Sequence, residues 1–175
     1  GNLVWQVNAE GNPTRFSFDG LSRMTKKEVA LAYGSPSTTF TSSIDTQWGF
    51  DKNNRLVSFK DDAANETTWV YDAKDRPISM TYPNSTTISY VYDATDDVTQ
   101  VTDAAGNVIS DTFDSLNRNT ARSISLATGF IDTTSEARTF DALNRVLTND
   151  DDDYKLTYTY GVRGLASTVY EEKQE

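Results

Sequence analysis

The sequence contains no cysteine and no histidine in its 175 residues. Without cysteine there are no disulfide bonds, thiolate zinc sites or cysteine nucleophiles, and without histidine no mechanism can use an imidazole. No apolar run has the length of a membrane span, so we expect no membrane insertion. Lys and Arg number 16 against 26 Asp and Glu, a net charge of −10, and such a chain lacks the basic surface that nucleic-acid binding requires. What remains is a structural role, ligand binding, or catalysis by carboxylates alone.

The residues that are abundant favour β-strands. The chain has 24 Thr, 9 Tyr and 8 Phe but only 2 Met, and β-branched and aromatic residues are typical of strands. A hydrophobic content of 37% can support a buried core. The N-terminus has no signal peptide, and the chain opens at Gly1 in mid-pattern, so we expect an excised piece of a longer protein.

One motif recurs along the whole chain: an aromatic residue, Asp, two variable residues, a turn former, usually Arg, then usually an aliphatic residue. Successive copies are 32, 21, 21, 21, 27 and 20 residues apart. The longer intervals predict insertions near 25–47 and 120–137. We therefore expect residues 1–175 to form a single array of about seven repeats. The copies begin at Phe18-Asp19, Phe50-Asp51, Tyr71-Asp72, Tyr92-Asp93, Phe113-Asp114 and Phe140-Asp141, with a decayed copy at Tyr160-Gly161.

The fifth position of the motif predicts a turn in left-handed geometry. Asn, Asp and Gly dominate there, and they tolerate positive φ best. The motif Asp can accept a hydrogen bond from an amide two residues on, as in an Asx turn. The fifth-position residues are Ser22, Asn54, Asp75, Asp96, Asn117, Asn144 and Gly164, of which Ser22 fits least well.

The flanks of the motif alternate as half-buried strands do. Pairs such as Trp69 and Tyr71 share a face, whereas Asp111 and Arg138 stand where two copies should have an aromatic. With a second turn between units, each repeat reads as strand, turn, strand, turn, giving about fourteen to sixteen strands. The helix-forming stretch 24–33 is predicted as a long strand or hairpin arm with its tip at 34–37. We expect the motif aromatics to pack in a column, with Tyr92 buried between Tyr71 and Phe113.

These residues resemble the YD-repeat, or RHS-repeat, family, most clearly at 71–76, 50–56 and in the Asp-x-x-Gly-Asn turn at 103–107. The resemblance implies an all-β protein, a spiral or curved antiparallel sheet of hairpins that forms part of an RHS-like shell. In bacterial RHS and toxin-complex proteins such shells enclose a toxin, and in teneurins a similar barrel is an adhesion scaffold. It thus implies a secreted or cell-surface protein, with flanking repeats of the parent chain and an encapsulated toxin domain as partners. The family's self-cleaving Asp-Pro motif is absent, since no proline follows an aspartate.

Catalysis, metal binding and carbohydrate binding are the alternatives to this structural role. The motif aspartates recur, whereas a catalytic pair is unique, so we expect no catalytic residue, no metal site and no cofactor; the acidic run 150–153 is expected to be a solvated turn. The recurrent arginines are expected to pair with motif aspartates or stack on the ring of an adjacent unit, rather than to line an anion path. The alternative function is a carbohydrate-binding module in which Trp5 or Tyr82 contacts surface glycans. The apolar N-terminal strand also predicts weak self-association.

Overall fold

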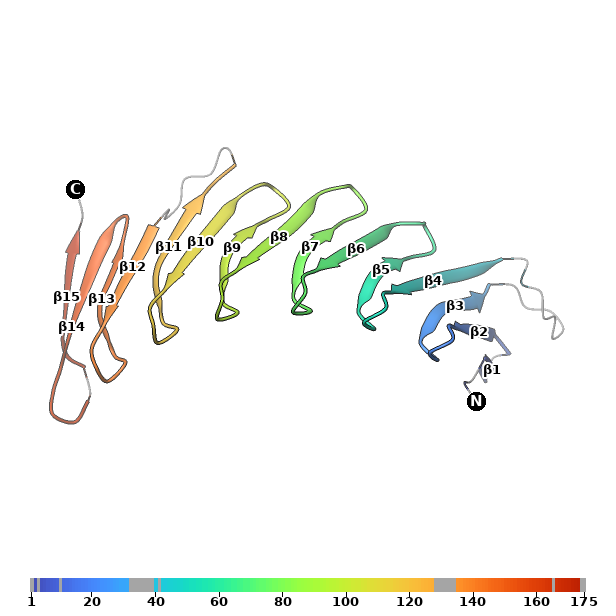
Figure 1. Ribbon diagram of the computed structural model, residues 1–175, viewed down its shortest axis with the longest axis horizontal. Helices are drawn as coiled ribbons and strands as arrows, with labels where there is room; N and C mark the ends of the chain where they lie inside the picture. Colours follow the sequence, from blue (N-terminus) through green and yellow to red (C-terminus); the bar gives the residue numbers. More distant parts are fainter. Residues whose placement is uncertain are drawn as a thin grey trace. The chain divides into compact units, whose positions relative to one another are not determined.

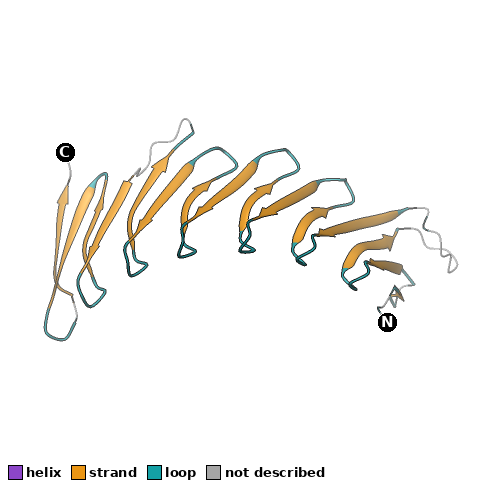
Figure 2. Cartoon of the chain, in the orientation of Figure 1, coloured by secondary structure: helices purple, strands orange, loops and turns teal. Residues whose placement is uncertain are grey.

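The computed structural model describes residues 2, 4–9, 11–31, 40, 42–127, 135–164 and 166–173. Within them lie fifteen strands and no helix, hence no helix that could cross a membrane. The chain divides into two units, Gly1–Thr86 and Thr87–Glu175, which we describe separately. The predicted all-β fold is confirmed (Figures 1 and 2).

The strands of unit 1 are β1 (Trp5–Val7), β2 (Pro13–Phe18), β3 (Met24–Ala30), β4 (Ser43–Phe50), β5 (Leu56–Lys60), β6 (Glu66–Tyr71) and β7 (Pro77–Thr81). Those of unit 2 are β8 (Thr87–Tyr92), β9 (Val98–Thr102), β10 (Val108–Phe113), β11 (Asn119–Ser125), β12 (Ser135–Phe140), β13 (Val146–Asp151), β14 (Tyr154–Tyr160) and β15 (Ala166–Lys173). Within each unit every strand pairs antiparallel with its neighbour in the chain, so each unit is a row of hairpins (Figure 1).

The motif forms the same turn in each copy. In the second copy the Asp51 amide donates to the Arg55 carbonyl at 3.0 Å, and the Asn54 amide donates to the Asp51 carbonyl at 3.3 Å. Asn54 has a φ of 66°, and the pairing slips by one residue at Gly49/Phe50. A turn closed by a left-handed residue and followed by a bulge is a common hairpin connection. All seven fifth-position residues have positive φ, which confirms the prediction: Ser22, Asn54, Asp75, Asp96, Asn117, Asn144 and Gly164.

Turns between successive motif copies also contain a residue with positive φ. In the turn at Asp103–Asn107 the Gly106 amide donates to the Asp103 carbonyl at 3.0 Å, and Gly106 has a φ of 87°. Ala64 takes the same place at a φ of 65° in the turn at Asp61–Asn65. In the described hairpins between residues 50 and 113, both ends are therefore closed by one kind of turn, in keeping with the 21-residue spacing of these copies.

Each unit is a single layer of sheet with two different faces. Large apolar and aromatic residues gather on one face, where Trp48 pairs with Phe59 across β4 and β5 at a ring separation of 6.1 Å. The other face carries small polar side chains and isolated apolar ones such as Val70, which is 53% exposed. Among the described residues, no strand lies outside this sheet to form a second layer over either face of a unit.

This architecture corrects the expected buried core. Among the described residues only Thr14, Glu28 and Ala30 are buried, and no large side chain is fully buried. The expected burial of Tyr92 between Tyr71 and Phe113 is wrong, since all three are only half-buried. A single layer offers its rings cover from neighbouring side chains only.

The two longer intervals of the repeat contain paired strands. β3 is a strand over Met24–Ala30, as predicted in preference to a helix, and it pairs with β4. The helix propensity of these residues does not decide their conformation here, because β3 forms backbone hydrogen bonds with a strand on each side. The predicted tip at 34–37 lies outside the described residues. In the second interval β11 and β12 pair on either side of 128–134, which also lie outside them.

Candidate functional site

The motif aspartate closes its own turn and binds its own arginine. Asp51 Oδ1 accepts hydrogen bonds from the amides of Asn53 and Arg55 at 2.9 and 3.0 Å. Its Oδ2 accepts from Nε and Nη2 of Arg55, both at 2.6 Å. The predicted Asx turn is therefore confirmed and reinforced by an ion pair in which two guanidinium nitrogens share one carboxylate oxygen. The same pair forms in Asp19–Arg23, Asp51–Arg55, Asp72–Arg76, Asp114–Arg118 and Asp141–Arg145.

The arginine also reaches the next repeat. The Arg55 guanidinium lies 4.8 Å from the centre of the Tyr71 ring, and its Nη1 donates to the Asp72 carbonyl at 2.9 Å and to Asp75 Oδ1 at 2.8 Å. We call this set of contacts, from one arginine to its own Asp and to the next ring and turn, the arginine clamp. Equivalent ring contacts are Arg23 on Phe50 at 4.9 Å, Arg118 on Phe140 at 4.6 Å and Arg145 on Tyr160 at 4.3 Å.

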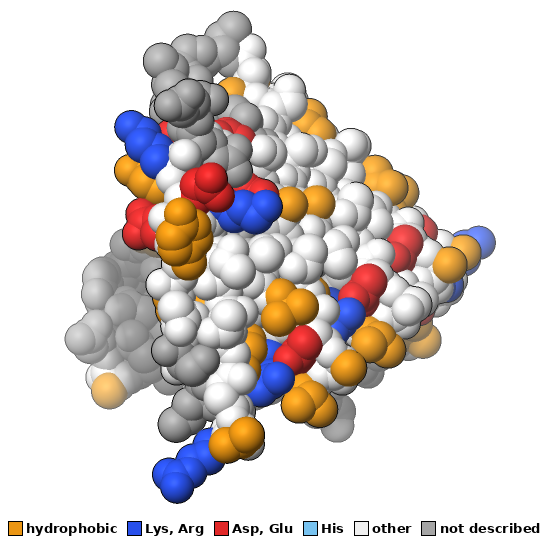
Figure 3. All heavy atoms as spheres, turned by 90° about the vertical axis from the view of Figure 1, so that its left-hand side faces the viewer, with side chains coloured by type: hydrophobic (Ala, Val, Ile, Leu, Met, Phe, Trp, Pro, Cys, Tyr) orange, Lys and Arg blue, Asp and Glu red, His pale blue; other side chains and the backbone are white. Residues whose placement is uncertain are grey.

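Strand register places each arginine over the right ring. The pairing Ala121↔Ala137 between β11 and β12, continued toward the turns, sets Arg118 opposite Phe140. The guanidinium then spans the distance to the next turn, where Nη1 meets the Asp141 carbonyl at 3.2 Å. Figure 3 shows acidic and basic side chains lying next to one another in rows on the surface. The expectation that the arginines bind motif aspartates and adjacent rings is confirmed.

The residue at the fifth position of the motif has a second role, which the sequence interpretation did not identify. Its side-chain oxygen accepts a hydrogen bond from the preceding repeat's arginine: Asn54 from Arg23 at 3.3 Å, and Asn144 from Arg118 at 3.4 Å. Glycine would satisfy the positive φ but would offer no such oxygen. The preference for Asn and Asp over Gly at this position was the available signal.

Tyrosine adds a hydrogen bond that phenylalanine lacks. The Tyr71 hydroxyl donates to the Leu56 carbonyl at 2.8 Å, and the Tyr160 hydroxyl donates to the Val146 carbonyl at 2.6 Å. In each case the acceptor is the first residue of the strand that follows the preceding turn. Each tyrosine ring is thus fixed at its face by a guanidinium and at its edge by a backbone carbonyl.

The fourth copy departs from the clamp because Asp97 occupies the arginine position. Asp93 still closes the turn, since its Oδ1 accepts from the amides of Thr95 and Asp97 at 2.9 and 3.0 Å. In this copy, therefore, the turn forms without a motif arginine four residues after the aspartate.

We predict that Asp93→Asn leaves the free energy of unfolding within about 0.5 kcal/mol, because an amide oxygen accepts the same two backbone hydrogen bonds. Asp93→Ala removes that acceptor and should cost about 1 kcal/mol. Urea unfolding of both variants measures the difference. Equal losses for Asn and Ala would show that the carboxylate has a role other than closing the turn.

In two motif copies of unit 2, the position two residues before the motif aromatic holds Asp111 or Arg138 instead of an aromatic residue. These charged residues form a polar network. Asp111 faces Arg122 across β10 and β11, with contacts of 2.9 and 3.1 Å, and accepts a hydrogen bond from Asn119 at 2.8 Å. Arg138 donates to Asn119 at 3.3 Å and to Asn149 at 2.9 Å. Burial would raise the pKa of Asp111, but the hydrogen bonds from Arg122 and Asn119 outweigh it and hold that pKa below its ordinary value. A charged residue on the aromatic face is thus accompanied by its cross-strand partner.

The two residues predicted to contact a ligand lie apart in unit 1. Trp5 is half-buried on β1, and its ring stacks on Phe40 at 5.5 Å, with the Arg15 guanidinium 5.0 Å from the Phe40 ring. Tyr82 is half-buried at the start of the turn after β7, where its amide donates to the Thr86 carbonyl at 2.8 Å. β1 and β7 are the first and last strands of this unit, so the structure does not bring these two aromatics into one site.

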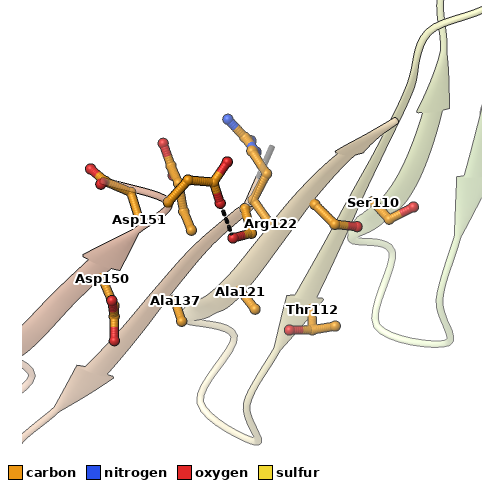
Figure 4. A pocket seen from close by; sticks show the side chains of 11 residues that line it. Ser110, Thr112, Ala121, Arg122, Ala137, Asp150 and Asp151 are labelled. Carbon is orange, nitrogen blue, oxygen red and sulfur yellow. Dashed lines mark hydrogen bonds between the residues drawn. The ribbon is translucent and has the colours of Figure 1, made fainter. Parts of the chain in front are cut away.

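A hollow of ≈ 570 Å³ lies over β10 to β13, and Figure 4 shows the side chains around it. Small residues line it, among them Ala121 and its strand partner Ala137, together with Arg122, Glu136 and residues 150–152 of the acidic run. The run forms a turn as predicted: Asp151 accepts from the amides of Asp153 and Tyr154, Ser135 donates to Asp152, and Lys155 lies 3.6 Å from Asp150. Across the described ranges, no three acidic side chains are grouped as a metal site.

We predict that the protein is acid-labile. Hydrogen bonds from the Arg55 amide and guanidinium lower the pKa of Asp51, and those from the side chains of Arg23 and Arg118 lower the pKa values of Asp19 and Asp114. Their folded pKa values thus lie below the unfolded value of about 3.9. The unfolded chain then binds more protons, and stability falls as the pH drops below about 4 toward the folded values. Thermal melts between pH 7 and pH 2.5 measure this, and an unchanged melting temperature would contradict it.

Comparison with known proteins agrees with this geometry. The sequence profile described as RHS Repeat matches residues 50–87 and 71–108. No curated protein sequence matches the chain. Residues 50–108 are therefore RHS repeats, and the resemblance drawn from the motif is confirmed.

Solved structures show the same fold. A crystal structure of TcdB2-TccC3-TEV superposes with a TM-score of 0.61 at 15% identity, covering 97% of this chain and 9% of that one. A crystal structure of TcdB2-TccC3 superposes with a TM-score of 0.57 at 15% identity, covering 85% of this chain and 9% of that one. This chain thus spans about a tenth of the length of the proteins that it resembles, and over that span it shares their fold.

Proposed function

We propose that the chain is a non-catalytic wall segment of a secreted or cell-surface RHS-repeat protein, one that encloses a toxin or other polypeptide. The observation that carries the proposal is that, among the described residues, each unit is one layer of sheet with almost no buried side chains. An enzyme or a ligand-binding domain usually places its site in a cleft between packed elements, whereas a wall needs only continuity along the sheet.

The arginine clamp supplies that continuity. Each clamp joins a turn to the turn of the next repeat through a ring contact and a backbone hydrogen bond, as Arg55 does with Tyr71 and Asp72. Because donor and acceptor recur in every regular copy, flanking repeats of a parent chain would dock in the same way. The aromatic face then offers an enclosed polypeptide a half-buried apolar lining.

Removal of one whole repeat tests the structural role. Deletion of residues 51–71 joins Phe50 to Asp72, so that Arg23 meets an equivalent ring and turn. We expect this variant to keep a cooperative unfolding transition and a β-sheet circular dichroism spectrum, with a lower melting temperature. A deletion of residues 51–61, half a repeat, should abolish cooperative unfolding because it breaks the register. Loss of cooperative folding in both variants would contradict interchangeable repeats.

Glycan titration separates the proposal from carbohydrate binding. A wall segment should give no saturable change in tryptophan fluorescence with any member of a glycan panel. A saturable response that Trp5→Ala removes would instead assign a sugar site to the Trp5–Phe40 stack. Tyr82→Ala is the matched test for the other aromatic.

A further inference from the structure

The junction between the fourth and fifth motif copies has the acceptor half of an arginine clamp but an acidic residue in place of the arginine. β9 pairs with β10 through Val101↔Ile109, and the same register continued toward the turns sets Asp97 opposite Phe113. Arg118 has this relation to Phe140 one copy later, where it forms the clamp. Asp97 therefore stands at the position from which a guanidinium covers the next ring.

The neighbouring turn keeps the groups that bind guanidinium elsewhere in the chain. Phe113 corresponds to Phe140, the Asp114 carbonyl to that of Asp141, and Asn117 to Asn144. Asn117 has a φ of 62°, close to the 65° of Asn144, so the two side chains leave the backbone in the same way. At the later junction these groups receive Arg118, whose guanidinium lies 4.6 Å from the ring and 3.2 Å from the carbonyl oxygen.

Asp97 adds a charge that suits a cation. Asp97 is half-buried. Its Oδ2 accepts a hydrogen bond from the Thr95 hydroxyl of the same turn at 3.1 Å. Exchange of arginine for aspartate changes the charge at this position by two units relative to a regular junction. A planar cation that stacks on a ring while donating to a carbonyl and a carboxylate is a guanidinium, whereas an ammonium group cannot make this combination of contacts.

We propose that the junction of Asp97 with Phe113, Asp114 and Asn117 is a binding site for an arginine side chain of another polypeptide. The bound guanidinium stacks on Phe113, donates to the Asp114 carbonyl and the Asn117 side chain, and forms an ion pair with Asp97. The site takes in trans the group that the other junctions supply in cis. It does not depend on whether the chain forms a wall.

The test uses the blocked peptide Gly-Arg-Gly as the probe and Gly-Lys-Gly as its control. NMR should show saturable shifts at the Phe113 ring and the Asn117 side-chain amide with the arginine peptide, and binding at least about fivefold weaker with the lysine peptide. Equal binding of both peptides, or no saturable shift at these residues, would overturn the proposal.

Three variants locate the site. Asp97→Arg should abolish peptide binding and raise the melting temperature, since the new side chain fills the site in cis. Asp97→Asn should weaken binding severalfold while leaving the fold intact, which keeps the proposal testable if the arginine variant misfolds. Asp62→Asn removes one negative charge from an exposed turn position and should leave binding unchanged. Full binding by Asp97→Asn would overturn the assignment.

Discussion

Tyr71→Ala should lower the free energy of unfolding by about 2–3 kcal/mol, less than for a fully buried aromatic because the ring is half-buried. The variant loses the face that Arg55 covers at 4.8 Å and the hydroxyl that donates to Leu56 at 2.8 Å. Tyr71→Phe keeps the ring and should lose only about 1 kcal/mol. Urea unfolding gives all values.

Val70 is the matched control because it is the adjacent residue on the opposite face and is 53% exposed. Val70→Thr preserves the β-branched shape and should change stability by less than about 0.5 kcal/mol. Losses of the same size at both positions would mean that the aromatic face has no greater part in stability than the polar face.

Arg118→Ala should cost about 2 kcal/mol, since it removes the ion pair from Nε and Nη2 to Asp114 Oδ2 and a cation–π contact with Phe140. Arg118→Lys keeps the charge but not the planar fork, and should still lose about 1 kcal/mol. Arg163 is an exposed arginine in the seventh turn, and Arg163→Ala should be neutral within about 0.5 kcal/mol. Thermal and urea unfolding decide the comparison, and full stability of Arg118→Lys would contradict the need for a guanidinium.

The repeat made most of the fold predictable. Its fixed spacing located the strands, and the Asn, Asp and Gly residues located the left-handed turns, because both depend on local backbone geometry. The partner of each arginine was also predictable in kind, since Asp and Arg recur four residues apart. What could not be predicted is which ring the guanidinium covers, because that depends on the register between successive strands.

Burial was the main error of the sequence interpretation. An alternating strand pattern predicts one covered face but does not say what covers it. In the described residues the aromatic face is covered by side chains of neighbouring strands in the same sheet; Trp69, for example, lies opposite Met80. The network around Asp111 was missed for a similar reason: its partner Arg122 is eleven residues away and meets it only through the hairpin register.

A double-mutant cycle between Arg118 and Phe140 tests most directly whether clamps hold the repeats together. The cycle compares Arg118→Ala, Phe140→Leu and the double variant by urea unfolding. A clamp predicts a coupling free energy of about 1 kcal/mol between the two positions, since the guanidinium lies 4.6 Å from the ring centre. The same cycle with Asp97→Ala and Phe113→Leu, where no arginine is present, should give a coupling near zero. Additive effects of Arg118→Ala and Phe140→Leu would contradict the account.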